Sequence, residues 1–182
     1  MRKLFFCIMV LCGFFLFAQD AETNFVVKNQ VLVKYRGASR EVIIPPRLGI
    51  NRIGVRAFAE TPIVSVVIPM GVGYIDDRAF MGCSFLKTVT LPNTLITVGH
   101  RAFFNCSLLE NINIPRSLVT IENGAFFNCR NLKEINLPDT LRSLGSRAFS
   151  GCMGLKTLSV SRRTKLGTHP FMGVSCDITY KD

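Results

Sequence analysis

Residues 79–106 read AFMGCSFLKTVTLPNTLITVGHRAFFNC, which is one full period of a pattern that runs through most of the chain. The stretch opens with AFxxC and closes with AFxxC after a step of 23 residues. The cysteines of this pattern are Cys83, Cys106, Cys129 and Cys152. The phenylalanines are Phe58, Phe80, Phe103, Phe126 and Phe149. A fixed step of this length indicates stacked repeats rather than a single globular core.

Each period contains a short alternating segment that predicts a β-strand. In Lys87–Leu91, Glu110–Ile114 and Lys133–Leu137 every second residue is apolar, as in a half-buried strand. A proline directly follows each segment and ends the pairing. With residues 40–44, residues 64–68 and the last repeat, the pattern predicts a parallel sheet of six strands.

The rest of each period predicts a turn. Its apolar residues lie three or four positions apart and end in the Ala-Phe pair, which favours a short helical or 3₁₀ turn. No single period can bury its own apolar stripe, so neighbouring periods must bury each other's.

The consensus of the period resembles the BspA-like, or treponemal-type, leucine-rich repeat. It is L-x-x-I-x-I/L-P-x-x-L-x-x-I/L-x-x-x-A-F-x-x-C-x-x, and the resemblance covers roughly residues 31–160. The resemblance implies a leucine-rich repeat solenoid with a parallel β-sheet on the concave face, short helical or 3₁₀ turns on the convex face, and caps at both ends. We expect a signal peptide at residues 1–18, a cap hairpin and first strand at 19–43, repeats at 44–160, and a carboxy-terminal cap at 161–182.

The amino terminus has the pattern of an export signal. Arg2 and Lys3 precede the apolar run Leu4–Phe17, and Ala18 is a small residue at which cleavage is expected, with Ala21 as a second option. The run is shorter than a membrane-spanning helix. No second apolar stretch follows, so we expect an exported chain, at the cell surface, in the periplasm or secreted, with no transmembrane segment after cleavage.

The charge balance favours anionic partners. The formal net charge is +10, and loss of Arg2 and Lys3 with the signal peptide lowers it by two, to +8. Acidic polysaccharide and lipid headgroups fit such a charge, whereas export argues against nucleic acid. A basic surface also serves solubility alone, and the sequence favours neither interpretation.

The motifs of known catalytic and metal sites are missing from the sequence. It has no nucleophile elbow, P-loop, dinucleotide fingerprint or metal-ligand spacing. Its two histidines, His100 and His169, are expected at the surface. We therefore predict a protein that is not an enzyme and that needs no cofactor.

The repeated cysteines are expected to be buried free thiols. Residues at one repeat position point in the same direction, so a bridge between neighbours would distort them. Free cysteine packs as a small hydrophobe. A bridge between Cys152 and Cys176 is the alternative. The phenylalanine column is predicted to be core, while Phe104 and Phe127 beside it are either a second core layer or an exposed apolar strip.

Two surfaces are candidates for binding. The first is the concave face of the sheet, whose outward residues are Ser65, Val67, Thr88, Thr90, Asn111, Asn113, Glu134, Asn136, Thr157 and Ser159. The second is a basic stripe at the residue before each Ala-Phe alanine, formed by Arg56, Arg78, Arg101 and Arg147. Stacked polar residues can also serve structure alone, as can solvated arginines that cover the phenylalanines.

The family resemblance implies a binding function. Members of this kind act as surface antigens and adhesins that bind host matrix proteins, so we expect an exported protein that mediates protein–protein interaction or adhesion to matrix components. The alternative is a periplasmic or secreted carrier or sensor of an apolar or anionic small ligand, held near Ile43 and Val67 or along Phe104 and Phe127. Assembly of a larger complex is a third interpretation.

Overall fold

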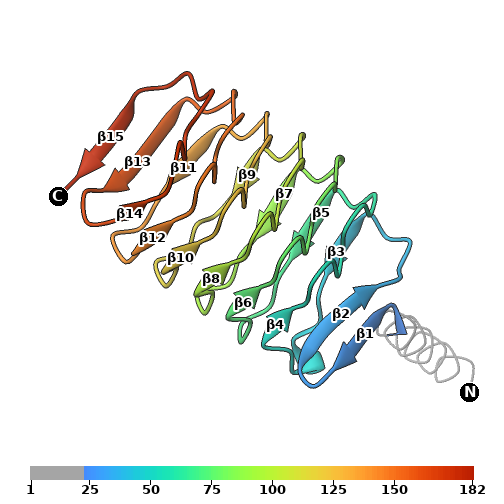
Figure 1. The fold of residues 1–182 in the computed structure, drawn as a ribbon. Helices are drawn as coiled ribbons and strands as arrows, with labels where there is room; N and C mark the ends of the chain where they lie inside the picture. Colours follow the sequence, from blue (N-terminus) through green and yellow to red (C-terminus); the bar gives the residue numbers. More distant parts are fainter. Residues whose placement is uncertain (1–22) are drawn as a thin grey trace, which may run out of the picture.

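The repeats stack side by side, and each contributes one strand to a first row of mostly longer strands and one two-residue strand to a second row (Figure 1). The computed structural model describes residues 23–182. The longer strands are β3 (Glu41–Ile43), β5 (Ser65–Val67), β7 (Thr88–Thr90), β9 (Asn111–Ile112), β11 (Glu134–Asn136), β13 (Thr157–Ser161) and β15 (Ile178–Lys181). We call the outward side of this row the strand face, which corresponds to the concave face expected from the sequence. Neighbouring strands pair in parallel, and the register advances by one repeat.

The row of longer strands differs from the sequence-based prediction in continuity. It forms a four-stranded sheet, β3-β5-β7-β9, and a separate three-stranded sheet, β11-β13-β15. The prediction of one unbroken sheet of six strands is therefore wrong. The break lies between β9 and β11, and β15 adds a strand that was not predicted.

A second sheet runs along the opposite side of each repeat. Its members are β1 (Phe25–Lys28), β2 (Val31–Tyr35), β4 (Arg52–Ile53), β6 (Tyr74–Ile75), β8 (Thr97–Val98), β10 (Thr120–Ile121), β12 (Ser143–Leu144) and β14 (Lys165–Leu166). The first two pair antiparallel as a hairpin, and the others pair in parallel. These two-residue strands were missed because a segment so short shows no clear period of two.

The expected turns are present, but they are successive β-turns rather than helices. In the second repeat Ala79 N donates to Asp76 O at 3.2 Å and Met81 N donates to Arg78 O at 3.0 Å, which is the i→i−3 bond of a 3₁₀ turn. Arg78 lies at φ 55°, in the left-handed region, and this interrupts any helix. Within residues 23–182 the one 3₁₀ helix is η1 (Pro46–Leu48).

The core is a continuous aromatic stack. The rings of Phe58, Phe80, Phe103, Phe126 and Phe149 are fully buried, and neighbouring centroids lie 4.9 to 5.1 Å apart. Tyr35 and Phe25 extend the stack at one end, and Phe171 extends it at the other. The prediction that this column is core is confirmed. Burial of these rings supplies a large apolar contribution that only neighbouring repeats can provide.

The cysteine column runs beside the phenylalanines and is hydrogen-bonded to them. Each thiol donates to the carbonyl oxygen of the phenylalanine one repeat earlier, as Cys106 Sγ does to Phe80 O at 3.1 Å. The same bond is made by Cys83, Cys129 and Cys152. All four thiols are free and buried, which confirms the prediction, and Cys176 is free and half-buried. The alternative bridge between Cys152 and Cys176 is wrong.

Both ends of the described chain continue the sheets. The hairpin of β1 and β2 places Tyr35 over Phe58 at a centroid distance of 5.0 Å. At the other end β14 and β15 extend the two rows by one more turn. The expected signal peptide lies outside the described residues. No helix within residues 23–182 is long and apolar enough to cross a membrane.

Candidate functional site

The ten residues predicted for the concave face all lie on the strand face. Between them the alternate residues Val66, Val89, Ile112, Ile135 and Leu158 point inward and are buried. Thr88, Thr90 and Asn111 are exposed, while Ser65 and Ser159 are half-buried. The surface is therefore a row of short polar side chains on ordered strands. It becomes apolar toward β3, where Ile43 is 72% exposed.

The break in this face is centred on Asn113. In three other repeats the backbone amide after the strand donates to a backbone carbonyl of the next repeat, as Ile68 N does to Thr90 O at 3.0 Å. Leu91 N donates instead to Asn113 Oδ1 at 2.7 Å, and Asn113 Nδ2 donates to Leu91 O at 2.8 Å. The side-chain amide thus replaces the peptide group in the ladder, a substitution to which asparagine is well suited.

The strands β9 and β11 share no ladder of backbone hydrogen bonds. β9 has two residues where β7 and β11 have three. No backbone hydrogen bond in the described chain joins Asn111, Ile112 or Asn113 to β11. Ile114 is only half-buried, whereas the residues at its position in the other repeats are buried. The strand face is therefore divided into two sheets at the repeat that contains Asn113.

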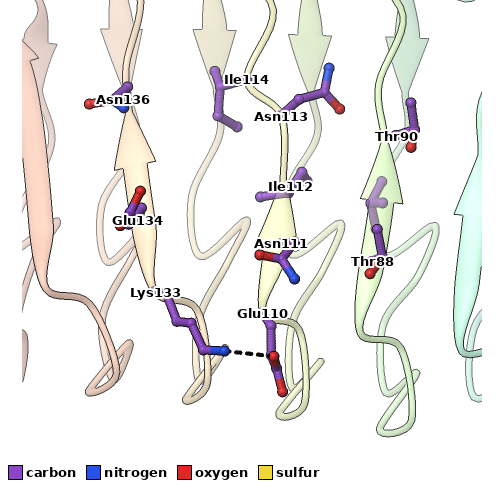
Figure 2. Close-up of a pocket in the computed structure, with 11 residues that line it drawn as sticks. Thr88, Thr90, Glu110, Asn111, Ile112, Asn113, Ile114, Lys133, Glu134 and Asn136 are labelled. Carbon is purple, nitrogen blue, oxygen red and sulfur yellow. Dashed lines mark hydrogen bonds and ion pairs between the residues drawn. The ribbon is translucent and has the colours of Figure 1, made fainter.

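A groove of about 720 Å³ extends over this break, from β7 across β9 to β11 (Figure 2). Its lining includes six of the ten predicted residues, which are Thr88, Thr90, Asn111, Asn113, Glu134 and Asn136. Ile114 lies between β9 and β11, and Lys133 and Glu110 lie at the lower end of the view. Ser65, Val67, Thr157 and Ser159 are on the same face but outside the groove. We call this feature the β9–β11 groove.

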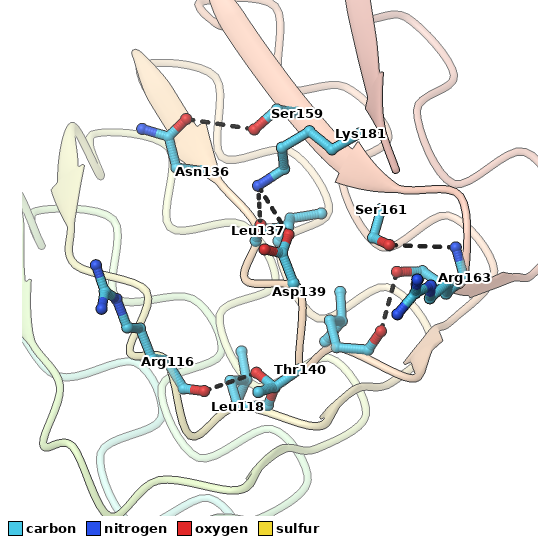
Figure 3. A network of polar contacts seen from close by, with 12 residues as sticks. Arg116, Leu118, Asn136, Leu137, Asp139, Thr140, Ser159, Ser161, Arg163 and Lys181 are labelled. Atoms are coloured by element: carbon cyan, nitrogen blue, oxygen red, sulfur yellow. Dashed lines mark hydrogen bonds and ion pairs between the residues drawn. The ribbon is translucent and has the colours of Figure 1, made fainter.

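Ion pairs lie at both ends of the break between β9 and β11. Lys133 Nζ lies 2.8 Å from Glu110 Oε2, and this cation lowers the pKa of the Glu110 carboxyl. Past Asn136 lies an adjoining hollow with a volume of about 610 Å³, beside Arg116 and Pro138. There Lys181 Nζ donates to Leu137 O at 2.9 Å and lies 3.3 Å from Asp139 Oδ1 (Figure 3).

Outside the groove, the repeat that contains β9 and the repeat that contains β11 are joined by hydrogen bonds. Thr140 Oγ1 donates to Arg116 O at 2.6 Å and to Leu118 O at 3.0 Å (Figure 3). The rings of Phe103 and Phe126 are 5.1 Å apart, so the core is continuous beneath the break. The groove is consequently a local opening in the face of an intact stack.

The arginines of the predicted basic stripe lie on the turns and do not line the β9–β11 groove. Arg56, Arg78, Arg101 and Arg147 all have φ between 53° and 55°. Arg56 faces Glu60 at 3.4 Å, while the guanidinium of Arg101 lies 5.4 Å from the ring centroid of Phe104. Phe104 and Phe127 stack at 5.0 Å and are half-buried, so they are neither fully core nor fully exposed.

The described residues hold no group of three or more His, Cys, Asp or Glu side chains that suits a metal ion. His100 is half-buried and His169 is exposed. Three charged residues line the β9–β11 groove: Lys133 and Glu110 form an ion pair at one end, and Glu134 lies on β11. The arrangement suits recognition by shape and hydrogen bonding.

Together, the two rows of parallel strands, the aromatic stack and the open face define a leucine-rich repeat solenoid. The chain belongs to the BspA-type family, because the model of the BspA type leucine rich repeat region matches residues 51–177 in six copies. A search of curated proteins finds no significant match.

Solved bacterial leucine-rich repeat proteins share the fold. The Treponema pallidum leucine-rich repeat protein is 24% identical with a TM-score of 0.69, over 86% of this chain and 81% of that one. A leucine-rich cell surface protein from Faecalibacterium prausnitzii is 25% identical with a TM-score of 0.70, over 86% and 52%. The pneumococcal vaccine antigen PcpA is 21% identical with a TM-score of 0.61, over 86% and 47%. The chain therefore spans about half the length of the last two.

Proposed function

We propose that this is an exported binding protein that recognises an extended segment of another protein, such as a host matrix component, in the β9–β11 groove. Membership of a repeat family that typically serves as a scaffold for protein interaction supports the general function. Export is supported by the signal-like pattern of residues 1–18 and by similarity to a cell surface protein of F. prausnitzii.

The observation that carries the proposal is the pair of strand edges facing each other without a shared ladder. Backbone N–H and C=O groups without a ladder partner on such edges can bond the main chain of an extended peptide that lies across the face. The side chains around them are short and polar, so they lose little rotamer entropy on contact. The strands themselves are already ordered by the stack beneath them.

Asn113→Thr tests the proposal directly. Threonine occupies the same position in the preceding repeat, at Thr90, where the ladder is continuous. We expect the substitution to restore pairing between β9 and β11 and to close the groove. Val67→Thr is the matched control, because Val67 holds the equivalent position in β5, is exposed on the same face and lies outside the groove.

Binding to surfaces coated with fibronectin, laminin or fibrinogen measures the outcome. We expect Asn113→Thr to lose binding and Val67→Thr to retain it. A contact with few charges should persist when the Debye length falls from about 10 Å at 0.1 M salt to 3 Å at 1 M. Equal binding by both variants, or loss of binding only when the four stripe arginines become Gln, refutes the β9–β11 groove as the site. Proteolysis of intact cells tests surface exposure separately.

A further inference from the structure

A second hollow lies on the turn side of the solenoid, where the arginine column is interrupted. Gly124 takes the position held by Arg78 and Arg101 in earlier repeats and by Arg147 in the next. The missing side chain leaves a hollow of about 490 Å³ between Arg101 and Arg147, over Phe104 and Phe127. We call this hollow the Gly124 notch.

The backbone does not require glycine at this position. Gly124 has φ 60°, and four arginines occupy the equivalent position at φ 53° to 55°. A Cβ at Gly124 would meet Arg101 Cγ at 3.5 Å and Phe127 Cβ at 3.8 Å, which are ordinary contacts. A side chain therefore fits here with the same left-handed backbone strain that four arginines already carry, and its absence creates the space.

The chemistry of the notch combines positive charge with an apolar floor. Among the described residues neither Arg101 nor Arg147 has a carboxylate within 4.0 Å, and both side chains are exposed. The floor is formed by two half-buried rings that stack on each other at 5.0 Å. Stacked rings present their edges sideways, and ring edges carry partial positive charge. His100, Asn123 and Ser146 add polar groups at the rim.

We propose that the Gly124 notch binds a carboxylate-bearing sugar of an acidic polysaccharide. The sugar ring lies against the exposed ring edges of Phe104 and Phe127, and its carboxylate accepts hydrogen bonds from Arg147. The repeats advance by about 5 Å, as the ring stack shows, and a glycan with one carboxylate per sugar carries charges at a comparable step. Arg78 then meets a neighbouring sugar along the same column.

The shape of the notch argues for a glycan over a membrane surface. The floor is recessed between two exposed arginines, so a single sugar can enter it while a flat array of headgroups meets only the guanidinium tips. The site is independent of the β9–β11 groove, because the two hollows have no lining residue in common.

The test uses Gly124→Arg, which adds positive charge and fills the space. If a sugar enters the notch, binding weakens although the net charge rises. If the column of arginines attracts polyanions only through its long-range positive electrostatic field, the same substitution strengthens binding. Arg147→Gln removes one wall, and Arg56→Gln is the control with equal loss of charge, since Arg56 lies outside the notch and faces Glu60.

Calorimetry with a hexamer of galacturonic acid, and with its methyl ester as the uncharged control, supplies the affinities. We expect Arg147→Gln to weaken hexamer binding by about tenfold to a hundredfold, the value of one charged hydrogen bond. Gly124→Arg should weaken it by about tenfold or more, because its side chain fills the notch. Arg56→Gln should bind like the parent, and the ester should not bind. Tighter binding by Gly124→Arg, equal losses in both glutamine variants, or binding to anionic vesicles but not to the hexamer would overturn the proposal.

Discussion

Phe126→Ala should cause one of the largest losses of stability in the chain. The ring is fully buried and lies between Phe103 and Phe149 at centroid distances of 5.1 and 5.0 Å. Replacing a buried phenylalanine by alanine typically costs about 3–5 kcal/mol. We expect the upper part of this range, about 4–5 kcal/mol, because the ordered repeats on both sides prevent the cavity from collapsing.

Phe171→Ala provides the comparison at the end of the same stack. Its ring is partly buried and has one aromatic neighbour, Phe149, at 6.3 Å. Full burial of a large apolar side chain contributes about 1.5–3 kcal/mol, so its partial burial predicts a loss of about 1–2 kcal/mol. The difference between the two variants follows from their positions in the stack rather than from their chemistry.

Equilibrium unfolding in guanidinium, followed by far-ultraviolet circular dichroism, measures both losses. A loss of about 4 kcal/mol is a large share of the 5–15 kcal/mol that stabilises a typical domain. The guanidinium concentration at the midpoint of unfolding should therefore be far lower for Phe126→Ala than for Phe171→Ala. Equal losses in the two variants would refute the argument, because they would show that stability does not depend on the neighbours of each ring.

The thiols provide two further predictions. Cys106 and Cys129 should resist alkylation in the folded protein and react fully after unfolding, as mass spectrometry can measure; labelling without denaturant would contradict their burial. Burial also raises the pKa of Cys152 from an ordinary value near 9 to about 12. The unfolded chain then loses this proton first, so stability should fall between about pH 9 and pH 12, and Cys152→Ala should reduce that slope by about 1.4 kcal/mol per pH unit. An unchanged slope in the variant would exclude this thiol as a cause.

The fold was predictable because its determinants repeat. A buried residue such as Phe103 or Cys106 has the same neighbours in every copy, so one physical requirement appears several times in the sequence. Period-two alternation located β5, β7 and β11 within a residue or two. The inward column and the polar outward row of the strand face follow from the same alternation.

The break in the strand face was not predictable from the same pattern. Asn113 and Asn136 occupy equivalent positions, and nothing in the periodicity distinguishes them. The first bonds the backbone of Leu91, while the second reaches only a serine hydroxyl. An asparagine in a strand is a weak signal, because the choice between backbone and side-chain bonding depends on how neighbouring repeats approach each other.

Both proposed sites occur where one repeat departs from its neighbours. A strict repeat presents the same side chain at every step, so it can provide a uniform face but no unique position along it. Asn113 interrupts the ladder that Thr90 continues, and Gly124 interrupts the column that Arg101 and Arg147 define. The aromatic and cysteine columns run unbroken through the same repeats, so neither departure opens the core. Because the core stabilises each repeat through its neighbours, single surface positions can change without loss of the fold. In such a solenoid we therefore expect binding specificity to be encoded by the residues that break the pattern, while the residues that keep it hold them in register.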